Sequence, residues 1–244
     1  MIRRIPRSCF LSLAALLLLA PAGRSFALAV PKYDPSLPAD ALCEVKIDDL
    51  RPMQFAIGLR EVKMRAAKVR LMNPQELDHY LDDHLGTIVI GPGGAPFVVD
   101  KHHLARVLIE AKAGSVIRAR VLENASKLSE PEFWAHMKEK KWVYLYDEHG
   151  KGPLDPADLP RTIAAMRDDP YRSLAWMVRT RGAVSKVEET PFAEFVWANF
   201  FRSRIPFQDT DAGFDEAVNQ AMKLAHSPEA KDLPGFKAEA AEKE

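Results

Sequence analysis

The chain of 244 residues carries 34 basic and 34 acidic residues, so its formal net charge at pH 7 is zero. It therefore lacks the overall basic excess that nonspecific duplex-DNA-binding proteins normally show, although a local basic patch remains compatible with this balance. The length allows one large domain or two small ones.

Residues 1–29 have the pattern of a secretory signal peptide. Arginines at positions 3, 4 and 7 precede the apolar segment 9–20, and Ala27-Leu28-Ala29 is a cleavage site of the A-x-A type. The apolar segment is too short to span a membrane as a helix. We therefore expect export by the general secretory route with cleavage after Ala29. The product would be a secreted or periplasmic protein with no stable membrane anchor.

Removal of this segment changes both the charge and the cysteine count. Its four arginines have no acidic counterparts, which leaves 30 basic and 34 acidic residues in the mature chain. Cys43 is then the one remaining cysteine, so no intrachain disulfide is expected, although the compartment would permit one.

The first part of the mature chain predicts a linker, a strand and two helices. Residues 30–42 contain three prolines and predict an extended linker. The alternating segment 43–47 predicts a half-buried strand. Residues 59–69 predict a helix of mixed charge, and residues 74–83 predict a second helix with a proline in its first turn.

Residues 86–111 contain the clearest local structural signals. Two short apolar runs, 86–90 and 95–99, flank the sequence Gly-Pro-Gly-Gly at 91–94 and predict two strands joined by a tight turn. Apolar residues at 104, 107, 108 and 111 then predict a helix, and residues 115–121 predict a further strand. Asp100 is expected to be the N-cap of this helix, accepting N–H bonds from His102 or His103.

The first turn of this helix is the candidate functional site. Lys101, His102 and His103 lie in that turn, and Arg106 follows one turn later. A helix N-terminus that combines free N–H groups, cations and imidazoles favours binding of a phosphate or another anion. The alternative is that Asp100 only caps the helix and the two histidines are solvated surface residues.

An ordered set of short motifs resembles a known family. In chain order these motifs are Cys43-x-Val45, Asp49-Leu50-Arg51-Pro52-x-Gln54-Phe55, Gly58, Glu61-Val62-Lys63, Val89-x-Gly91-Pro92-Gly93-Gly94 and Asp100-x-His102-His103-Leu104-Ala105. Together they resemble the secreted branch of the ParB/sulfiredoxin superfamily, whose members are described as ParB-like nucleases. The resemblance covers residues 43–121 and extends to about residue 206.

The resemblance implies an α+β fold, in which a small mixed-sheet ParB/sulfiredoxin-like core carries a largely helical C-terminal extension packed on it. It also implies that the Asp-x-His-His turn holds phosphates against a helix N-terminus. The expected organisation is a signal peptide at 1–29, a linker at 30–42, the core at 43–125, the helical extension at 126–206, and an acidic, partly disordered tail at 207–244.

Two positions in the turn differ from the wider superfamily, and a third differs from sulfiredoxins alone. Lys101 stands where relatives have glycine, which obstructs close approach of the backbone to a pyrophosphate. Leu104 replaces an arginine, whose guanidinium only Lys101 or Arg106 could partly replace. His102 occupies the position of the sulfiredoxin cysteine, so sulfiredoxin chemistry is not expected.

The candidate site residues follow from the resemblance and from residue type. The candidate catalytic residues are Asp100, His103, His102 and Glu61; the candidate phosphate- or nucleotide-binding residues are Lys101, His102, His103, Arg106, Lys63, Gly93 and Gly94. Asp100 and Glu61 would ligate Mg²⁺ or Mn²⁺, or act as a base.

In the same scheme a histidine would protonate a leaving oxygen, and the lysines would neutralise phosphoryl charge. For Glu61 and Lys63 the alternative is an ordinary solvated helix face. A transition-metal site of His79, His84, His102 and His103 is a weaker alternative, since positions 79 and 84 do not share a helix face.

The second half predicts mainly helices. They are expected at 124–140, 159–168, 170–181 and 191–204, with a strand at 142–146. The aromatic stripe between Phe192 and Phe201 is interpreted as core. We expect this helical half to form one wall of the cleft of the core.

Two classes of function fit these observations. The first is a secreted nuclease or phosphodiesterase. The second is a non-catalytic module that binds a nucleotide or another phosphorylated ligand, and kinase-type phosphotransfer ranks below both. The expected partners are therefore a nucleotide, a nucleic acid or another phosphorylated ligand. The enzyme hypothesis requires Glu61, Asp100 and a histidine to converge, whereas the binding hypothesis requires only the helix N-terminus and its cations.

Overall fold

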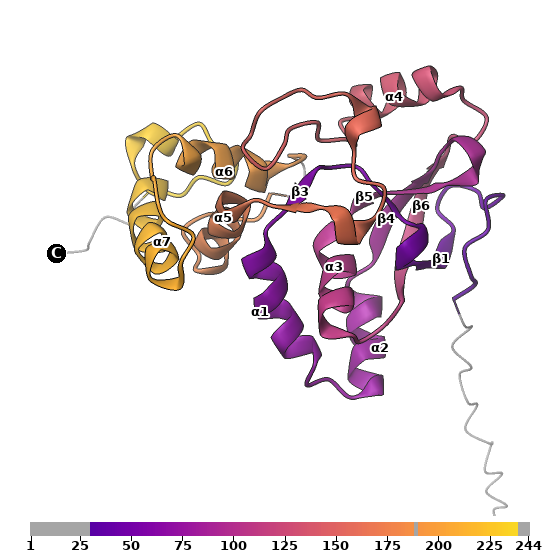
Figure 1. The fold of residues 1–244 in the computed structure, drawn as a ribbon, viewed down its shortest axis with the longest axis horizontal. Helices are drawn as coiled ribbons and strands as arrows, with labels where there is room; N and C mark the ends of the chain where they lie inside the picture. Colours follow the sequence, from indigo (N-terminus) through magenta and orange to yellow (C-terminus); the bar gives the residue numbers. More distant parts are fainter. Residues whose placement is uncertain (1–29, 188–189, 239–244) are drawn as a thin grey trace, which may run out of the picture.

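The computed structural model describes residues 30–187 and 190–238, which form an α+β fold with a helical C-terminal part (Figure 1). The predicted signal peptide lies outside the described residues. Among the residues that are described, no helix combines the length and apolar character needed to cross a membrane.

A five-stranded mixed sheet forms the centre of the core, as the resemblance predicted. Its strand order is β1 (Leu42–Lys46), β6 (Val116–Asn124), β4 (Gly86–Ile90), β5 (Pro96–Asp100) and β2 (Arg51–Pro52). The β1–β6 and β4–β5 pairs are antiparallel, and the β6–β4 and β5–β2 pairs are parallel. The predicted hairpin is confirmed as β4 and β5.

Three helices cover one face of this sheet (Figure 1). They are α1 (Leu59–Val69), α2 (Pro74–Asp83) and α3 (His102–Ala111), and the first two have the predicted bounds. Asn73 caps α2 with its side chain, which accepts N–H bonds from Gln75 and Glu76. The predicted strand at 115–121 is confirmed as part of β6.

The side chains of β4 alternate between two cores. Ile88 and Ile90 pack against the α1–α3 layer, whereas Val89 points to the opposite face. There it packs with Phe133 and Met137 of α4 (Glu130–Glu139), so the sheet is covered on both sides.

The helical C-terminal part has a core of its own, built by α5 (Pro170–Thr180), α6 (Ala193–Arg202) and α7 (Asp211–Ala225). Trp197, Phe200 and Phe201 are buried in it, as predicted for the aromatic stripe. A short parallel ladder between β3 (Ala56–Ile57) and β7 (Arg167–Asp168) joins this part to the sheet core.

The start of α1 approaches α5 closely. A Cβ atom added at Gly58 would lie 2.5 Å from Ser173 Oγ and 2.8 Å from the Ser173 backbone nitrogen. Glycine at position 58 therefore permits the contact between α1 and α5.

Several predicted elements differ from the structure. The predicted helix at 159–168 is a short 3-10 turn, Ile163–Ala165, followed by β7, because the Arg167 N–H bonds to the Phe55 carbonyl instead of continuing a helix. The segment 142–146 forms one bridge, between Gln54 and Tyr144, and no strand. The helix predicted from residue 124 begins at Glu130, since Asn124 belongs to β6.

The two terminal segments are more ordered than the sequence suggested. The expected linker lies along the core, where the Tyr33 hydroxyl donates to the Gly94 carbonyl and Asn124 donates to the Leu37 carbonyl. The tail at 207–244, expected to be partly disordered, contains α7, and the Trp197 indole N–H bonds to the Pro234 carbonyl beyond it. Residues 239–244 lie outside the described part of the chain.

Candidate functional site

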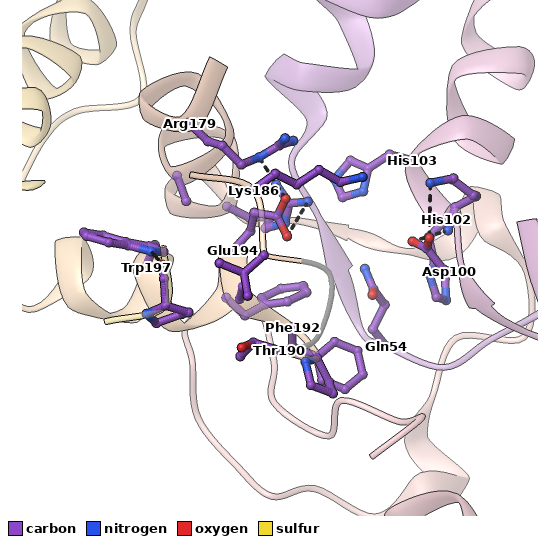
Figure 2. Close-up of a pocket in the computed structure, with 18 of the residues that line it drawn as sticks. Gln54, Asp100, His102, His103, Arg179, Lys186, Thr190, Phe192, Glu194 and Trp197 are labelled. Carbon is purple, nitrogen blue, oxygen red and sulfur yellow. Dashed lines mark hydrogen bonds and ion pairs between the residues drawn. The ribbon is translucent and has the colours of Figure 1, made fainter. Parts of the chain in front are cut away.

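A cavity of about 600 Å³ lies between the sheet core and the helical part (Figure 2). The core contributes Gln54, one face of α1 and the first turn of α3. The opposite wall consists of α5, the start of α6 and the segment that precedes it. The helical part thus forms one wall of the cleft, as expected.

Basic residues outnumber acidic ones around this cavity. Among the described residues, its walls carry seven basic side chains and three carboxylates, namely Arg65, Lys101, Lys140, Lys141, Arg172, Arg179 and Lys186, with Glu61, Asp100 and Glu194. Enclosed walls of low polarisability strengthen the field of such a cluster, so the cavity favours anions.

Glu61 is buried among the charged side chains of the cavity, with only 4% of its side chain exposed. Its Oε1 accepts a bond of 3.0 Å from Arg65, and its Oε2 accepts one of 3.2 Å from Arg172. A buried carboxylate with two guanidinium partners has its charge compensated in place. Glu61 is therefore not the solvated helix-face residue that the alternative supposed.

His102 and His103 are buried and accept hydrogen bonds from the backbone. His102 Nε2 accepts the Met53 N–H at 3.1 Å, and His103 Nε2 accepts the Gly58 N–H at 3.0 Å. Each Nε2 is therefore the unprotonated nitrogen of a neutral ring. The predicted general acid would need a proton on a free ring nitrogen, and the Nε2 atoms are not available for that role.

Burial determines the protonation of both rings. It lowers the pKa of His102 from 6.5 to about 4, against the opposing effect of the Asp100 charge. Burial, together with the charges of Arg172 and Arg65, lowers the pKa of His103 well below its ordinary value. Both histidines are accordingly neutral at physiological pH, and neither is the solvated residue that was the alternative.

Asp100 is not the N-cap of α3. It ends β5, its Oδ1 accepts the Lys101 N–H at 2.7 Å, and its Oδ2 lies 3.2 Å from Lys101 Nζ. Lys101 is the residue at the N-cap position, with the left-handed φ of 76°. This conformation favours glycine, the residue that the resemblance implies for the wider superfamily at this position.

Two arginines of α5 have unsatisfied donors toward the cavity. Within the described residues, neither the Nε–H of Arg172 nor that of Arg179 has a hydrogen-bond acceptor, and both nitrogens are buried. Buried donors normally have a partner, so these two Nε–H groups are candidates for binding an oxygen-bearing ligand.

The sequence interpretation missed the arginines of α5, although it placed their helix correctly. Residues 172 and 179 are seven apart and lie on the same face of a helix. A basic pair with this spacing on a helix that also buries Leu174 and Val178 was the available signal. The lysines at 140, 141 and 186 had no comparable pattern.

Four of the predicted phosphate-binding residues do not line the cavity. Arg106 donates to the carbonyl of Ala164 at 3.0 Å, and Lys63 is solvent-exposed on α1. Gly93 and Gly94 form the β4–β5 turn, at the end of β5 opposite to Asp100. Lys101, His102 and His103 do line it, together with Asp100 and Glu61.

The residues do not fit the expected divalent-metal site. Glu61 is bound by two guanidinium groups, and Asp100 pairs with its neighbour Lys101. No group of three or more His, Cys, Asp or Glu among the described residues is placed to hold a metal ion, and His84 instead stacks on Tyr80.

The histidine bonds predict a stability that depends on pH. Between pH ~6.5 and pH ~4 the unfolded chain binds protons that the folded chain does not, so the free energy of unfolding falls as the pH falls through this range. A pKa shift of this size corresponds to about 3 kcal/mol for His102. In His102→Gln the glutamine keeps a hydrogen-bond acceptor but does not titrate. Urea unfolding should therefore show that the free energy of unfolding of this variant falls less steeply as the pH is lowered.

The control for this experiment is Val107→Ala in the same helix, where the side chain is fully buried. It should lower the free energy of unfolding by a similar amount at every pH, because it creates a cavity and changes no titrating group. Equal pH slopes for His102→Gln and the unchanged chain would contradict the role assigned to the ring.

Comparisons with known proteins agree with this architecture. A family model described as "Putative ParB-like nuclease" matches residues 43–203, which is more than half of the chain. The crystal structure of protein Atu1540 from Agrobacterium tumefaciens is 35% identical in sequence, with a TM-score of 0.72. The match covers 82% of this chain and 99% of that chain. No curated protein matches.

Both comparisons extend across the sheet core and into the helical part, so they include both walls of the cavity. The ordered motifs, the mixed sheet and the family match lead to one conclusion. The chain belongs to the ParB-like nuclease family and has its α+β fold with a helical C-terminal part.

Proposed function

We propose that this ParB-like protein binds a phosphorylated ligand, a nucleotide or a nucleic-acid segment, in the cavity between its core and its helical part. The observation that carries the proposal is the excess of cations, seven against three carboxylates, around one enclosed cavity of the described residues. Phosphate groups are the common biological anions that such a cluster fits by charge and by hydrogen-bond donors.

The N-terminus of α3 adds backbone donors to this cluster. The first bond within the helix runs from the Ala105 N–H to the Lys101 carbonyl, so the N–H groups of residues 102–104 have no acceptor in the helix. All three residues line the cavity. The partial positive charge of the helix end supports an anion there.

Aromatic side chains in the walls favour a nucleotide over a simple phosphate. Trp142 and Phe192 line the cavity beside Lys141, and Lys140 lies over the Trp142 ring at 5.9 Å. Flat aromatic faces next to cations suit stacking of a base whose phosphate binds nearby.

Binding has more geometric support than catalysis does. The oxygens of Glu61 contact Arg65 and Arg172, whereas those of Asp100 contact Lys101. His103 Nε2 lies 3.4 Å from Glu61 Oε2 but accepts the Gly58 N–H, and within the described residues no hydrogen bond or ion pair joins Asp100 to either of them. The convergence that a hydrolytic centre requires is therefore not supported by these contacts.

Phosphodiester hydrolysis is the second candidate. It is favoured by the family description and by Asp100, whose side chain is 65% exposed and lines the same cavity. Lys101 keeps the pKa of Asp100 below its ordinary value, against the opposing effect of partial burial. The carboxylate is therefore charged and able to accept a proton from water at neutral pH.

The binding proposal predicts the effect of Lys101→Gly. This change removes a cation from the cavity and places glycine at a left-handed φ, so folding stability should stay equal or rise by up to ~1 kcal/mol. Affinity for ADP and for a short single-stranded oligonucleotide should fall roughly three- to tenfold, because one attractive charge is lost. Isothermal titration calorimetry at low and high salt measures the two affinities, and urea unfolding measures the folding stability.

Lys112→Gly is the matched control. Lys112 lies at the other end of the same helix, also has a left-handed φ of 53°, and does not line the cavity. Its replacement should leave affinity unchanged. An equal loss of affinity in both variants would contradict binding in this cavity.

The hydrolysis candidate predicts turnover that depends on Asp100. Single- and double-stranded DNA, RNA and a chromogenic phosphodiester would be incubated with Mg²⁺, Mn²⁺ or EDTA. Turnover should be lost in Asp100→Asn and kept in Asp34→Asn, a carboxylate outside the cavity that bonds to Ser36. If none of these substrates is turned over, the hydrolysis candidate is contradicted and the binding proposal is unaffected.

We also propose that the protein acts outside the cytoplasm, from the signal-peptide pattern of residues 1–29. The full-length chain, produced in a bacterial host with an intact secretory system, should be recovered from the periplasm or medium with Val30 as its first residue. Intact-mass measurement checks this, and an unprocessed cytoplasmic chain would contradict it.

A further inference from the structure

Arg172 and Arg179 form a pair of guanidinium groups on one face of α5. Seven residues correspond to two helical turns, or about 10.5 Å along the axis. Both arginines line the cavity, and in the described part of the chain the Nε–H of each lacks a hydrogen-bond acceptor. The pair therefore presents donors and positive charge to the same space.

The carboxylate of Glu194 forms ion pairs with both of these arginines, and Figure 2 shows it beside Arg179. It comes from the first turn of α6, with Oε1 at 3.1 Å from Arg179 Nε and Oε2 at 3.9 Å from Arg172 Nη2. Neither contact satisfies an Nε–H donor. Glu194 thus offsets one of the two positive charges of the pair and leaves its Nε–H donors unsatisfied.

Glu61 provides a contrast within the same cavity. It is 4% exposed and accepts two hydrogen bonds from guanidinium groups, of 3.0 Å and 3.2 Å. Glu194 is 29% exposed and makes only the two ion pairs described above. Of these two carboxylates, Glu194 is therefore the one that an incoming anion can displace.

Glu194 is charged in this position. Burial alone would raise the pKa of its carboxyl, but Arg172 and Arg179 outweigh burial and lower it. A carboxylate held by two arginines is a chemical analogue of a phosphoryl group with fewer oxygens and a smaller charge. A phosphoryl group offers three oxygens and up to two charges, which suits donors that the carboxylate leaves unsatisfied.

We propose that Arg172 and Arg179 form the phosphoryl subsite of the cavity and that Glu194 is an internal anion which the ligand must displace. Glu194 then sets the affinity of the site and its selectivity for highly charged ligands over weakly charged ones. The inference rests on the proposed function and names the residues that hold the phosphoryl group and regulate its binding.

The test compares Glu194→Gln with the unchanged chain, using inorganic pyrophosphate, ADP and uncharged adenosine as probes in isothermal titration calorimetry. Loss of the competing charge should tighten pyrophosphate and ADP binding at least about tenfold, since like charges about 4 Å apart repel strongly in a partly buried site. Adenosine binding should not change. This dependence on ligand charge is a readout that a purely structural role of Glu194 would not produce.

Glu229→Gln is the matched control. It removes the same charge from the helical part, where Glu229 pairs with Arg204 and does not line the cavity. Its affinities should equal those of the unchanged chain. In the double variant Glu194→Gln/Arg179→Gln the gain should disappear, because half of the subsite is removed.

A further variant guards against loss of folding, because Glu194 lies in the first turn of α6, where a negative charge stabilises the helix. Glu194→Asp keeps this charge and shortens the side chain by one methylene, so it cannot bridge both arginines as well. It should show a smaller gain for pyrophosphate and ADP. Thermal unfolding establishes that each variant is folded before titration.

The outcomes separate the inference from the function on which it rests. Binding of ADP by the unchanged chain with no gain in either Glu194 variant overturns the displacement of Glu194 and leaves the proposed function standing. No binding of any phosphorylated probe by the unchanged chain or by the variants overturns both. A gain that is equal for adenosine and for ADP also overturns the inference, because it would not depend on charge.

Discussion

The two hydrogen bonds that the rings of His102 and His103 accept are the constraint on which the site depends. They attach the backbone at Met53 and Gly58 to the first turn of α3. Gly58 begins α1 and touches α5, so these bonds connect the sheet core to the helical part through one buried junction. Both walls of the cavity are positioned by this junction, and the bonds require both rings to remain neutral.

Basic and acidic side chains are unevenly distributed over the fold, which the amino-acid composition does not reveal. The whole chain has equal numbers of acidic and basic residues, yet the described residues concentrate cations around one cavity. Glu61 offsets one of the two charges of Arg65 and Arg172, and lysines from other elements also line the cavity. The fold therefore combines a balanced overall charge with a local field that favours phosphate.

The resemblance to the ParB/sulfiredoxin superfamily pointed to a turn that lines the cavity, but it did not predict what the side chains of this turn contact. The expected histidines lie at the cavity, yet their Nε2 atoms bind the backbone of the core. Lys101 adopts the left-handed conformation that explains the glycine of relatives. The spacing of residues in a helix turn predicts which residues lie next to one another. A residue with positive φ before the helix changes the direction of the backbone, and therefore what each side chain of the first turn contacts.

Local sequence determined the elements whose signals are local. The helices at 59–69 and 74–83, the β4–β5 hairpin and the aromatic core of α6 follow from periodicity, a capping asparagine and a glycine-rich turn. Only tertiary structure decided that residues 167–168 pair with β3 instead of forming a helix. Tertiary structure alone also placed Arg172, Arg179 and Glu194 on the cavity wall that faces the turn at Asp100. Contacts between distant segments depend on packing, which no short sequence pattern encodes.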